Sequence, residues 1–173
     1  ASSWSNPNPI RRRYIDSSVN EGIAFYFEEM LLQAGLFDFS PRSREIILSY
    51  ARLRALRVEV DIRLAVGDFS IGQAAEYLAR TVPMDQATAR EEAVFFAFNP
   101  GQAISYQVGK LQILEFLADA GLDQGDEFSL RHFHDFLMLN GNVPIALQRW
   151  EYLGRDDAVR RLDAMNEPVT VPQ

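Results

Sequence analysis

The chain is a series of segments in which apolar residues recur every three to four positions, each ended by a residue that caps or breaks a helix. This period is typical of amphipathic α-helices, whereas strands alternate strictly. No alternating segment is present, so the sequence predicts an all-α protein. One domain is expected over residues 1–166, with an irregular lead-in over 1–16 and a tail over 167–173. Helices are predicted over about 18–34, 41–66, 71–80, 85–98, 102–120 and 130–140, with a last amphipathic stretch after Pro144.

Two of these helices are apolar on two sides, and each carries a polar group on its second side. The second stripes hold Glu21, Phe25, Glu28 and Leu32 in the first helix, and Tyr106, Ile113 and Leu117 in the second. A helix apolar on two sides is normally packed on two sides, so both helices are expected to be central. An isolated carboxylate on a covered face would be costly. Glu21 and Tyr106 are therefore predicted to meet.

Composition restricts the class of protein without identifying it. In 173 residues, 47% are hydrophobic and 24% are charged, as in an ordinary globular protein. The net charge of −7 argues against a nucleic-acid partner. No apolar run approaches the roughly 20 residues that span a bilayer. The absence of cysteine excludes disulfides and thiolate chemistry, and it leaves the cellular compartment open.

The segment from Glu21 to Glu28 reads like the helix that supplies the third ligand in a zinc metallopeptidase. A catalytic zinc usually has three protein ligands, and in HExxH enzymes two of them are histidines one helical turn apart. The chain has two histidines, His132 and His134. At about 100° per residue, such a pair on a helix points to nearly opposite sides. The chain alone is therefore expected to bind no stoichiometric zinc.

Five short motifs occur in the order and spacing of one bacterial family. They are Arg11-Arg12; Glu21-Gly22 with Ala24 and Tyr26; Arg54-Ala-Leu-Arg57 with Val60-Asp61; Pro100-Gly-Gln-Ala-Ile-Ser-Tyr106 with Gly109-Lys-Leu; and Phe133-His134-Asp135 with Gly141 and Pro144. From about residue 8 to residue 150, the chain resembles the C-terminal half of the family filed as domain of unknown function 885. That family is similar to the gluzincin-type HExxH zinc metallopeptidases. Its HExxH-like segment lies shortly before the Arg-Arg stretch.

The resemblance implies roles for four residues. Glu21 would be the third zinc ligand, and Tyr106 would donate its hydroxyl to the oxyanion formed during peptide hydrolysis. Arg54 and Arg57 would hold a substrate carboxylate by paired hydrogen bonds. The histidine pair would come from an N-terminal half or from a separate subunit. The complete protein would then hydrolyse a peptide or amide with a zinc-activated water.

The chain departs from the family pattern at two places. After Val60-Asp61 the family tends to have a small residue and glycine, closely followed by a histidine, whereas this chain has Ile62, Arg63 and Ala65. Ahead of Pro-Gly-Gln-Ala, the family has an arginine and a tyrosine, and this chain has Phe95 and Phe96. These changes imply either a more apolar substrate or the loss of catalysis.

Three of these residues, Glu21, Tyr106 and His134, also have a purely structural interpretation. Ser18 and Glu21 fit a capping box, in which the carboxylate reaches back to the Ser18 amide. A phenol such as Tyr106 is most often a core residue with a satisfied hydroxyl. His134 falls on an apolar side of its helix and is expected to be buried and hydrogen-bonded.

The charged and aromatic clusters have similar explanations. Arg54 and Arg57 could pair with Glu59 or with surface acids. The run from Arg11 to Arg13 is expected to be solvated, and the cluster Phe95-Phe96-Phe98 is expected to lie in the core.

Two functions of another class stay open. The chain could be an inactive ligand-binding domain on the same scaffold, with a phenylalanine-lined cavity for an apolar ligand. It could also be an interaction domain, whose two-sided helices bury themselves against another chain. If the chain works with a missing N-terminal half, an exposed apolar patch is expected beside Glu21, whereas a polar surface there would favour the ligand-binding domain.

Overall fold

The computed structural model describes residues 7–165, and within that range it is all-helical and contains no strand. The predicted fold class is confirmed. The tail predicted over 167–173 lies outside the described residues. The helices are α1 (Ser17–Gln33), α2 (Pro41–Ala65), α3 (Ile71–Thr81), α4 (Gln86–Phe98), α5 (Gln102–Gln124), α6 (Leu130–Asn140), α7 (Ile145–Leu153) and α8 (Asp157–Met165), with short 3-10 helices at Arg11–Arg13 and Gly125–Glu127.

Local capping signals account for most of the helix starts. The side chains of Asp16, Asp85 and Ser129 accept hydrogen bonds from the first turns of α1, α4 and α6. Ser70 forms a complete capping box with Gln73 at the start of α3. These contacts satisfy amide groups that have no partner within the helix, which is why the predicted starts agree with the structure.

One predicted helix end is wrong, and the last predicted stretch is divided. Gly121 does not end α5, which continues to Gln124 and stops at Gly125, where the backbone has a φ of +52°. The amphipathic stretch after Pro144 forms two helices, because Gly154 adopts a left-handed conformation and separates α7 from α8. Glycine adopts positive φ angles, such as those of Gly125 and Gly154, without steric cost. It also occurs inside helices, as Gly121 does in α5, so a glycine in the sequence does not by itself mark a helix end.

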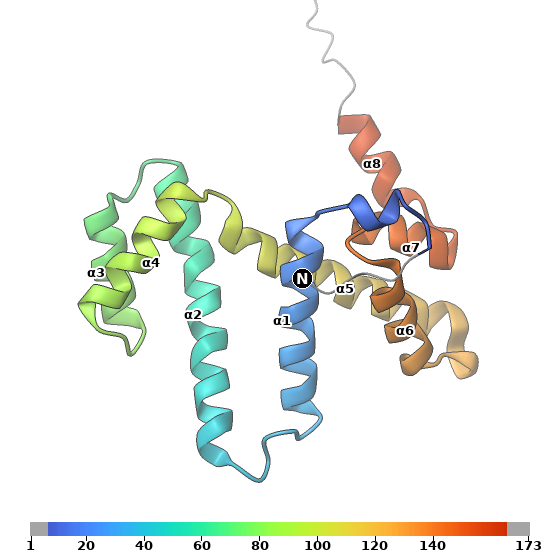
Figure 1. The fold of residues 1–173 in the computed structure, drawn as a ribbon, viewed down its shortest axis with the longest axis horizontal. Helices are drawn as coiled ribbons and strands as arrows, with labels where there is room; N and C mark the ends of the chain where they lie inside the picture. Colours follow the sequence, from blue (N-terminus) through green and yellow to red (C-terminus); the bar gives the residue numbers. More distant parts are fainter. Residues whose placement is uncertain (1–6, 166–173) are drawn as a thin grey trace, which may run out of the picture.

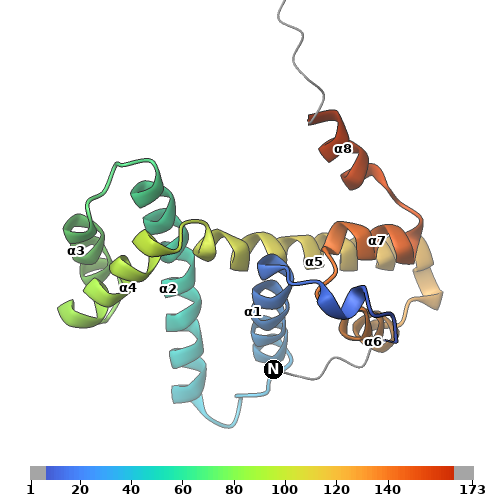
Figure 2. The same cartoon turned by 45° about the horizontal axis from the view of Figure 1, so that its top comes forward.

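Helix α5 connects two packed groups of helices (Figures 1 and 2). Beside its N-terminal part, α2, α3 and α4 bury one apolar cluster that includes Val60, Leu78 and Ala93. Along its C-terminal part, α5 packs with α1, α6 and α7 around Phe116 and Phe133. The central position predicted for the 102–120 helix is therefore confirmed.

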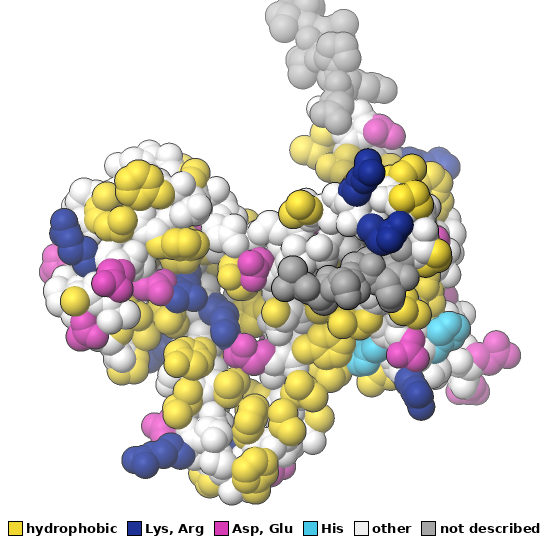
Figure 3. Space-filling model, in the orientation of Figure 1, with side chains coloured by type: hydrophobic (Ala, Val, Ile, Leu, Met, Phe, Trp, Pro, Cys, Tyr) yellow, Lys and Arg dark blue, Asp and Glu magenta, His cyan; other side chains and the backbone are white. Residues whose placement is uncertain are grey.

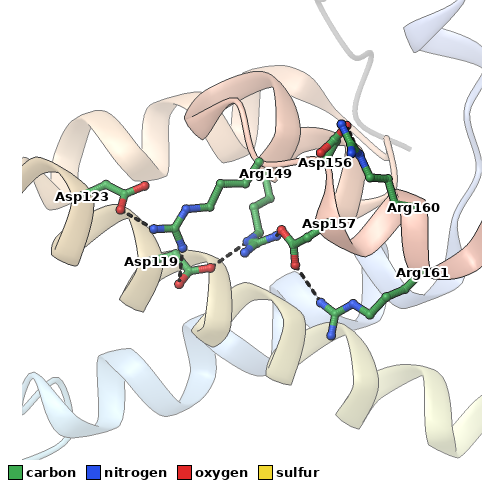
Figure 4. A network of polar contacts seen from close by, with 8 residues as sticks. Asp119, Asp123, Arg149, Asp156, Asp157, Arg160 and Arg161 are labelled. Carbon is green, nitrogen blue, oxygen red and sulfur yellow. Dashed lines mark hydrogen bonds and ion pairs between the residues drawn. The ribbon is translucent and has the colours of Figure 1, made fainter.

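Helix α8 is tied to the rest of the molecule by a network of ion pairs (Figure 4). Arg149, which is 7% exposed, donates to Asp119 at 2.7 Å and to Asp157 at 2.6 Å. Arg155 also binds Asp119, and Arg161 binds Asp157 within α8. The network joins α5, α7 and α8 through one buried guanidinium group.

The lead-in segment is also attached. Arg11 donates two hydrogen bonds of 2.8 Å to Glu151 and one of 2.6 Å to Asn140. The expectation that the whole arginine run is solvated is therefore wrong for Arg11, although Arg12 and Arg13 are exposed. Separately, none of the helices over residues 7–165 is long and apolar enough to cross a membrane.

Candidate functional site

Two glycines let α1 and α5 cross in backbone contact. A Cβ atom on Gly22 would lie 2.5 Å from the Cα of Gly109, and a Cβ on Gly109 would overlap the carbonyl oxygen of Ser18. Only glycine fits at both positions, because any side chain would force the helices apart. The crossing brings Glu21, next to Gly22, close to Tyr106, which lies one turn before Gly109.

Glu21 and Tyr106 meet at this crossing, as predicted. Gln102, one turn before Tyr106, donates its amide to the Glu21 carboxylate at 3.4 Å. Burial, a hydrogen bond to Glu21 and the charge of that carboxylate raise the pKa of Tyr106, while Gln102 and Arg57 act in the opposite direction. The phenol, the carboxylate and the amide thus form one polar cluster, and the charge of Arg57 acts on its phenol.

The capping-box interpretation of Glu21 is wrong. Helix α1 begins at Ser17, and its cap is Asp16, whose carboxylate accepts a 3.2 Å hydrogen bond from the amide of Val19. Glu21 lies a full turn inside the helix, so its carboxylate does not serve the helix terminus. This leaves the Glu21 carboxylate directed to the cluster with Gln102 and Tyr106.

A buried carboxylate fixes the start of α5. Asp61, 1% exposed on α2, accepts hydrogen bonds of 2.9 Å from the amides of Gly101 and Ala103. A carboxylate is stabilised at a helix N-terminus by these amides and by the helix dipole. The contact joins two of the sequence motifs, and it sets the position of Tyr106 relative to α2. The spacing in sequence gave no sign of this contact.

Both predicted substrate-binding arginines are paired with carboxylates inside the chain. Arg57 of α2 forms a bidentate pair with Glu92 of α4, at 2.6 and 2.5 Å, and Arg54 pairs with Glu28 of α1. Pairing with acids was one expectation, but the partner Glu59 was wrong. The two guanidinium groups are largely neutralised before any ligand arrives.

The phenylalanine cluster is divided between core and surface. Phe96 is buried, and Arg57 lies over its ring at 5.9 Å, beside the polar cluster. Phe95 is 49% exposed and Phe98 is 80% exposed, so the core expectation is wrong for these two. Both lie in the last turn of α4, and neither belongs to the apolar cluster that α4 forms with α2 and α3.

The two histidines of α6 do not converge. His134 Nε2 lies 2.8 Å from the hydroxyl of Tyr26, and its ring packs against Phe27, so the predicted hydrogen bond is confirmed, but the side chain is half-buried and not fully buried as expected. His132 is exposed and lies beside the ring of Tyr152. Within residues 7–165 no group of three or more histidine or acidic side chains is placed to hold a metal ion.

We expect the phenol of Tyr106 to stay protonated well into the alkaline range. Because its pKa is raised above 10.0 in the folded chain, the stability that it contributes is present below pH 10 and is lost as the pH rises through the folded pKa. Tyr106→Phe should remove one late phase from the ultraviolet titration of the tyrosines and cost about 1 kcal/mol of stability at pH 7. An unchanged titration would show that Tyr106 is not buried in the cluster.

The second titration prediction concerns His134, where burial lowers the pKa and the charge of Asp135 acts weakly against this. The unfolded chain takes up this proton first as the pH falls below 6.5, so the stability contributed by neutral His134 is lost as the pH falls through its folded pKa. His134→Gln should flatten the pH dependence of the unfolding free energy below pH 6.5. A wild-type slope retained in His134→Gln would contradict this prediction.

Comparison with known proteins places this all-helical chain in a family. It belongs to the family described as "Bacterial protein of unknown function (DUF885)", whose model matches residues 1–150. A solved structure described as "putative lipoprotein from Colwellia psychrerythraea" is similar, with 29% sequence identity and a TM-score of 0.75. The match covers 90% of this chain and 26% of that one, so the chain spans about a quarter of the length of its solved relative. No curated protein matches the chain.

Proposed function

We propose that this chain supplies one side of the active site of a zinc-dependent peptidase or amide hydrolase. The HExxH segment that completes the site lies on another part of the polypeptide or on a partner subunit. The observation that carries the proposal is the meeting of Glu21 and Tyr106 at the Gly22–Gly109 crossing. A carboxylate and a protonated phenol in one cluster are the two groups that such a reaction needs from this side of the site.

Glu21 suits the role of a metal ligand because its described partners are neutral. It accepts a hydrogen bond from the amide of Gln102 and lies beside the phenol of Tyr106, and over residues 7–165 it forms no ion pair. A ligating carboxylate held by neutral donors keeps its charge available to a cation. One ligand does not make a site, so the other donors must come from elsewhere. A zinc ion bound there would polarise an amide carbonyl and supply an activated water.

Tyr106 suits the role of a hydrogen-bond donor. Its raised pKa keeps the proton on the phenol at neutral pH, so it can donate to an oxygen on which negative charge develops. Two side chains restrain its surroundings, since Asp61 holds the start of α5 and Gln102 binds Glu21 and also interacts with the phenol of Tyr106. Such restraint matters because a donor stabilises charge best when it is already positioned.

The arginines act mainly as positioning residues in this proposal. Arg57 links α2 to α4 through Glu92 and also influences the phenol of Tyr106 electrostatically. Arg54 links α2 to α1 through Glu28. These pairs hold α1, α2 and α4 around the cluster, which a free carboxylate-binding arginine would not do.

The experiment uses the full-length gene product and a set of N-acylated dipeptide amides, with amide hydrolysis as the readout. Tyr106→Phe is expected to lower kcat by about 100-fold, in line with the loss of one oxyanion donor, and Tyr14→Phe at an exposed position should leave it unchanged. Equal rates for wild type and Tyr106→Phe would refute the role of the phenol.

The second candidate is an inactive ligand-binding domain on the same scaffold. The ion pairs of Arg54 and Arg57 favour it, because they remove the free cations expected at a substrate carboxylate. A full-length protein that binds the amides without hydrolysing them, with or without zinc, would support this candidate over the hydrolase.

A further inference from the structure

An open groove lies between α1 and α2 and continues onto α5. It has a volume of about 470 Å³, within the range of roughly 300–1,000 Å³ that is usual for small-molecule sites. Its walls are mainly apolar, and they include Phe25 and Leu32 from α1 with Ile47, Leu48, Ala51 and Ala55 from α2. Figure 3 shows hydrophobic side chains over this part of α1 and α2, with acidic and basic side chains toward α5.

The groove begins next to the Glu21–Tyr106 cluster. Phe25 follows Glu21 by four residues, and Lys110 follows Tyr106 by four, so each wall residue lies one helical turn beyond a member of the cluster. A peptide or amide ligand whose amide bond lies at the Glu21–Tyr106 cluster would therefore place the side chain next to that bond at the mouth of the groove.

Every cation that lines the groove is already paired. Lys110 donates to Glu29 at 2.7 Å, and Arg44 donates to Asp38 at 2.5 Å. Lys110 also lies over the ring of Phe25, at 4.5 Å. The two carboxylates of the lining, Glu28 and Glu29, are likewise paired, with Arg54 and with Lys110. An anionic or a cationic ligand would therefore have to break such a pair or remain unpaired in a largely apolar space, and both are unfavourable.

We propose that the groove between α1 and α2 binds the uncharged, bulky apolar side chain of a peptide or amide ligand, beside the bond held at the Glu21–Tyr106 cluster. The placement beside a reacting bond rests on the proposed function, whereas the choice of an apolar side chain rests on the groove alone. Phe25 forms the buried part of the wall, and Ala51 and Ala55 leave room for the side chain because each is small.

The test measures binding to the chain itself, without added metal. N-acetyl-leucinamide and N-acetyl-phenylalaninamide are titrated by NMR, and N-acetyl-lysinamide and N-acetyl-aspartic acid amide are titrated under the same conditions. The apolar amides are expected to bind at least about 10-fold more tightly, because burying an unpaired charge is costly. Equal affinity for all four would overturn the proposal.

Matched variants locate the binding. Ala55→Trp fills the groove from an exposed position on α2 and should weaken binding of the apolar amides at least about 10-fold, whereas Ala118→Trp, at an exposed position of α5 that does not line the groove, should not. Ile47→Ser provides a second groove variant should the tryptophan disturb α2. Unchanged affinity in both groove variants would overturn the proposal. A chain that binds none of the amides, and forms instead a dimer that Ala55→Trp disrupts, would also overturn it. Because no turnover is measured, failure here leaves the hydrolase proposal standing, and an inactive full-length protein leaves the groove standing.

Discussion

Replacing Gly109 by alanine is expected to destabilise the chain by about 3 kcal/mol, the upper end of what overpacking costs in a protein interior. The added Cβ would overlap the carbonyl oxygen of Ser18, and backbone atoms cannot move aside as a flexible side chain can. Helices α1 and α5 would have to separate, and the contact between Glu21 and Tyr106 would be lost with them. Denaturant unfolding followed by circular dichroism at 222 nm measures the change.

The same helix offers a matched control. Gly121 is also helical, but a Cβ atom there would meet nothing within 4 Å. Gly121→Ala should therefore stabilise the chain by about 0.5–1 kcal/mol, as expected for alanine over glycine in a helix. If the two variants unfolded at the same denaturant concentration, the close crossing of α1 and α5 would be contradicted.

The second large effect is expected at Asp61. Asp61→Ala removes a buried carboxylate that accepts from the amides of Gly101 and Ala103, and leaves both amides without this partner. We expect a loss of about 3 kcal/mol, since hydrogen bonds to charged groups contribute roughly 1.5–3 kcal/mol and buried donors without a partner add to the cost. Denaturant unfolding gives the free energy, and the near-ultraviolet spectrum should report the altered surroundings of Tyr106.

Two comparisons make this prediction specific. Asp61→Asn keeps the shape and one acceptor oxygen, so its cost should fall between wild type and Asp61→Ala. Asp68→Ala, at an exposed position after α2, should change stability by less than about 0.5 kcal/mol. A loss of similar size at Asp61 and Asp68 would mean that the cap on α5 contributes little.

The helices could be predicted from the sequence because their signals are local. Pro41 begins α2 and Ser70 caps α3, each within one turn of the helix that it starts. The meeting of Glu21 and Tyr106 was also predictable, since each lies on the second apolar face of its helix. Gly121 misled the prediction because nothing in its neighbourhood forces the chain to turn there.

The rest of the site could not be predicted because its contacts join residues far apart in sequence. Arg57 and Glu92 are separated by 35 residues, and Arg54 and Glu28 by 26. Spacing along one helix says nothing about such partners, so an arginine held by a carboxylate looks the same in sequence as one free to bind a substrate. The groove between α1 and α2 was equally hidden, because its two walls come from helices whose relative placement depends on α5.

The central claim is that Glu21 completes a metal site with donors that this chain does not contain. The direct measurement is the zinc content and zinc affinity of the full-length gene product, for wild type, Glu21→Gln and Glu29→Gln. Glu29 lies on the same helix but is paired with Lys110, so it serves as the matched control. We predict about one zinc per wild-type chain, affinity reduced by at least about 100-fold in Glu21→Gln, and no change in Glu29→Gln. Zinc bound equally well by wild type and Glu21→Gln would contradict the account.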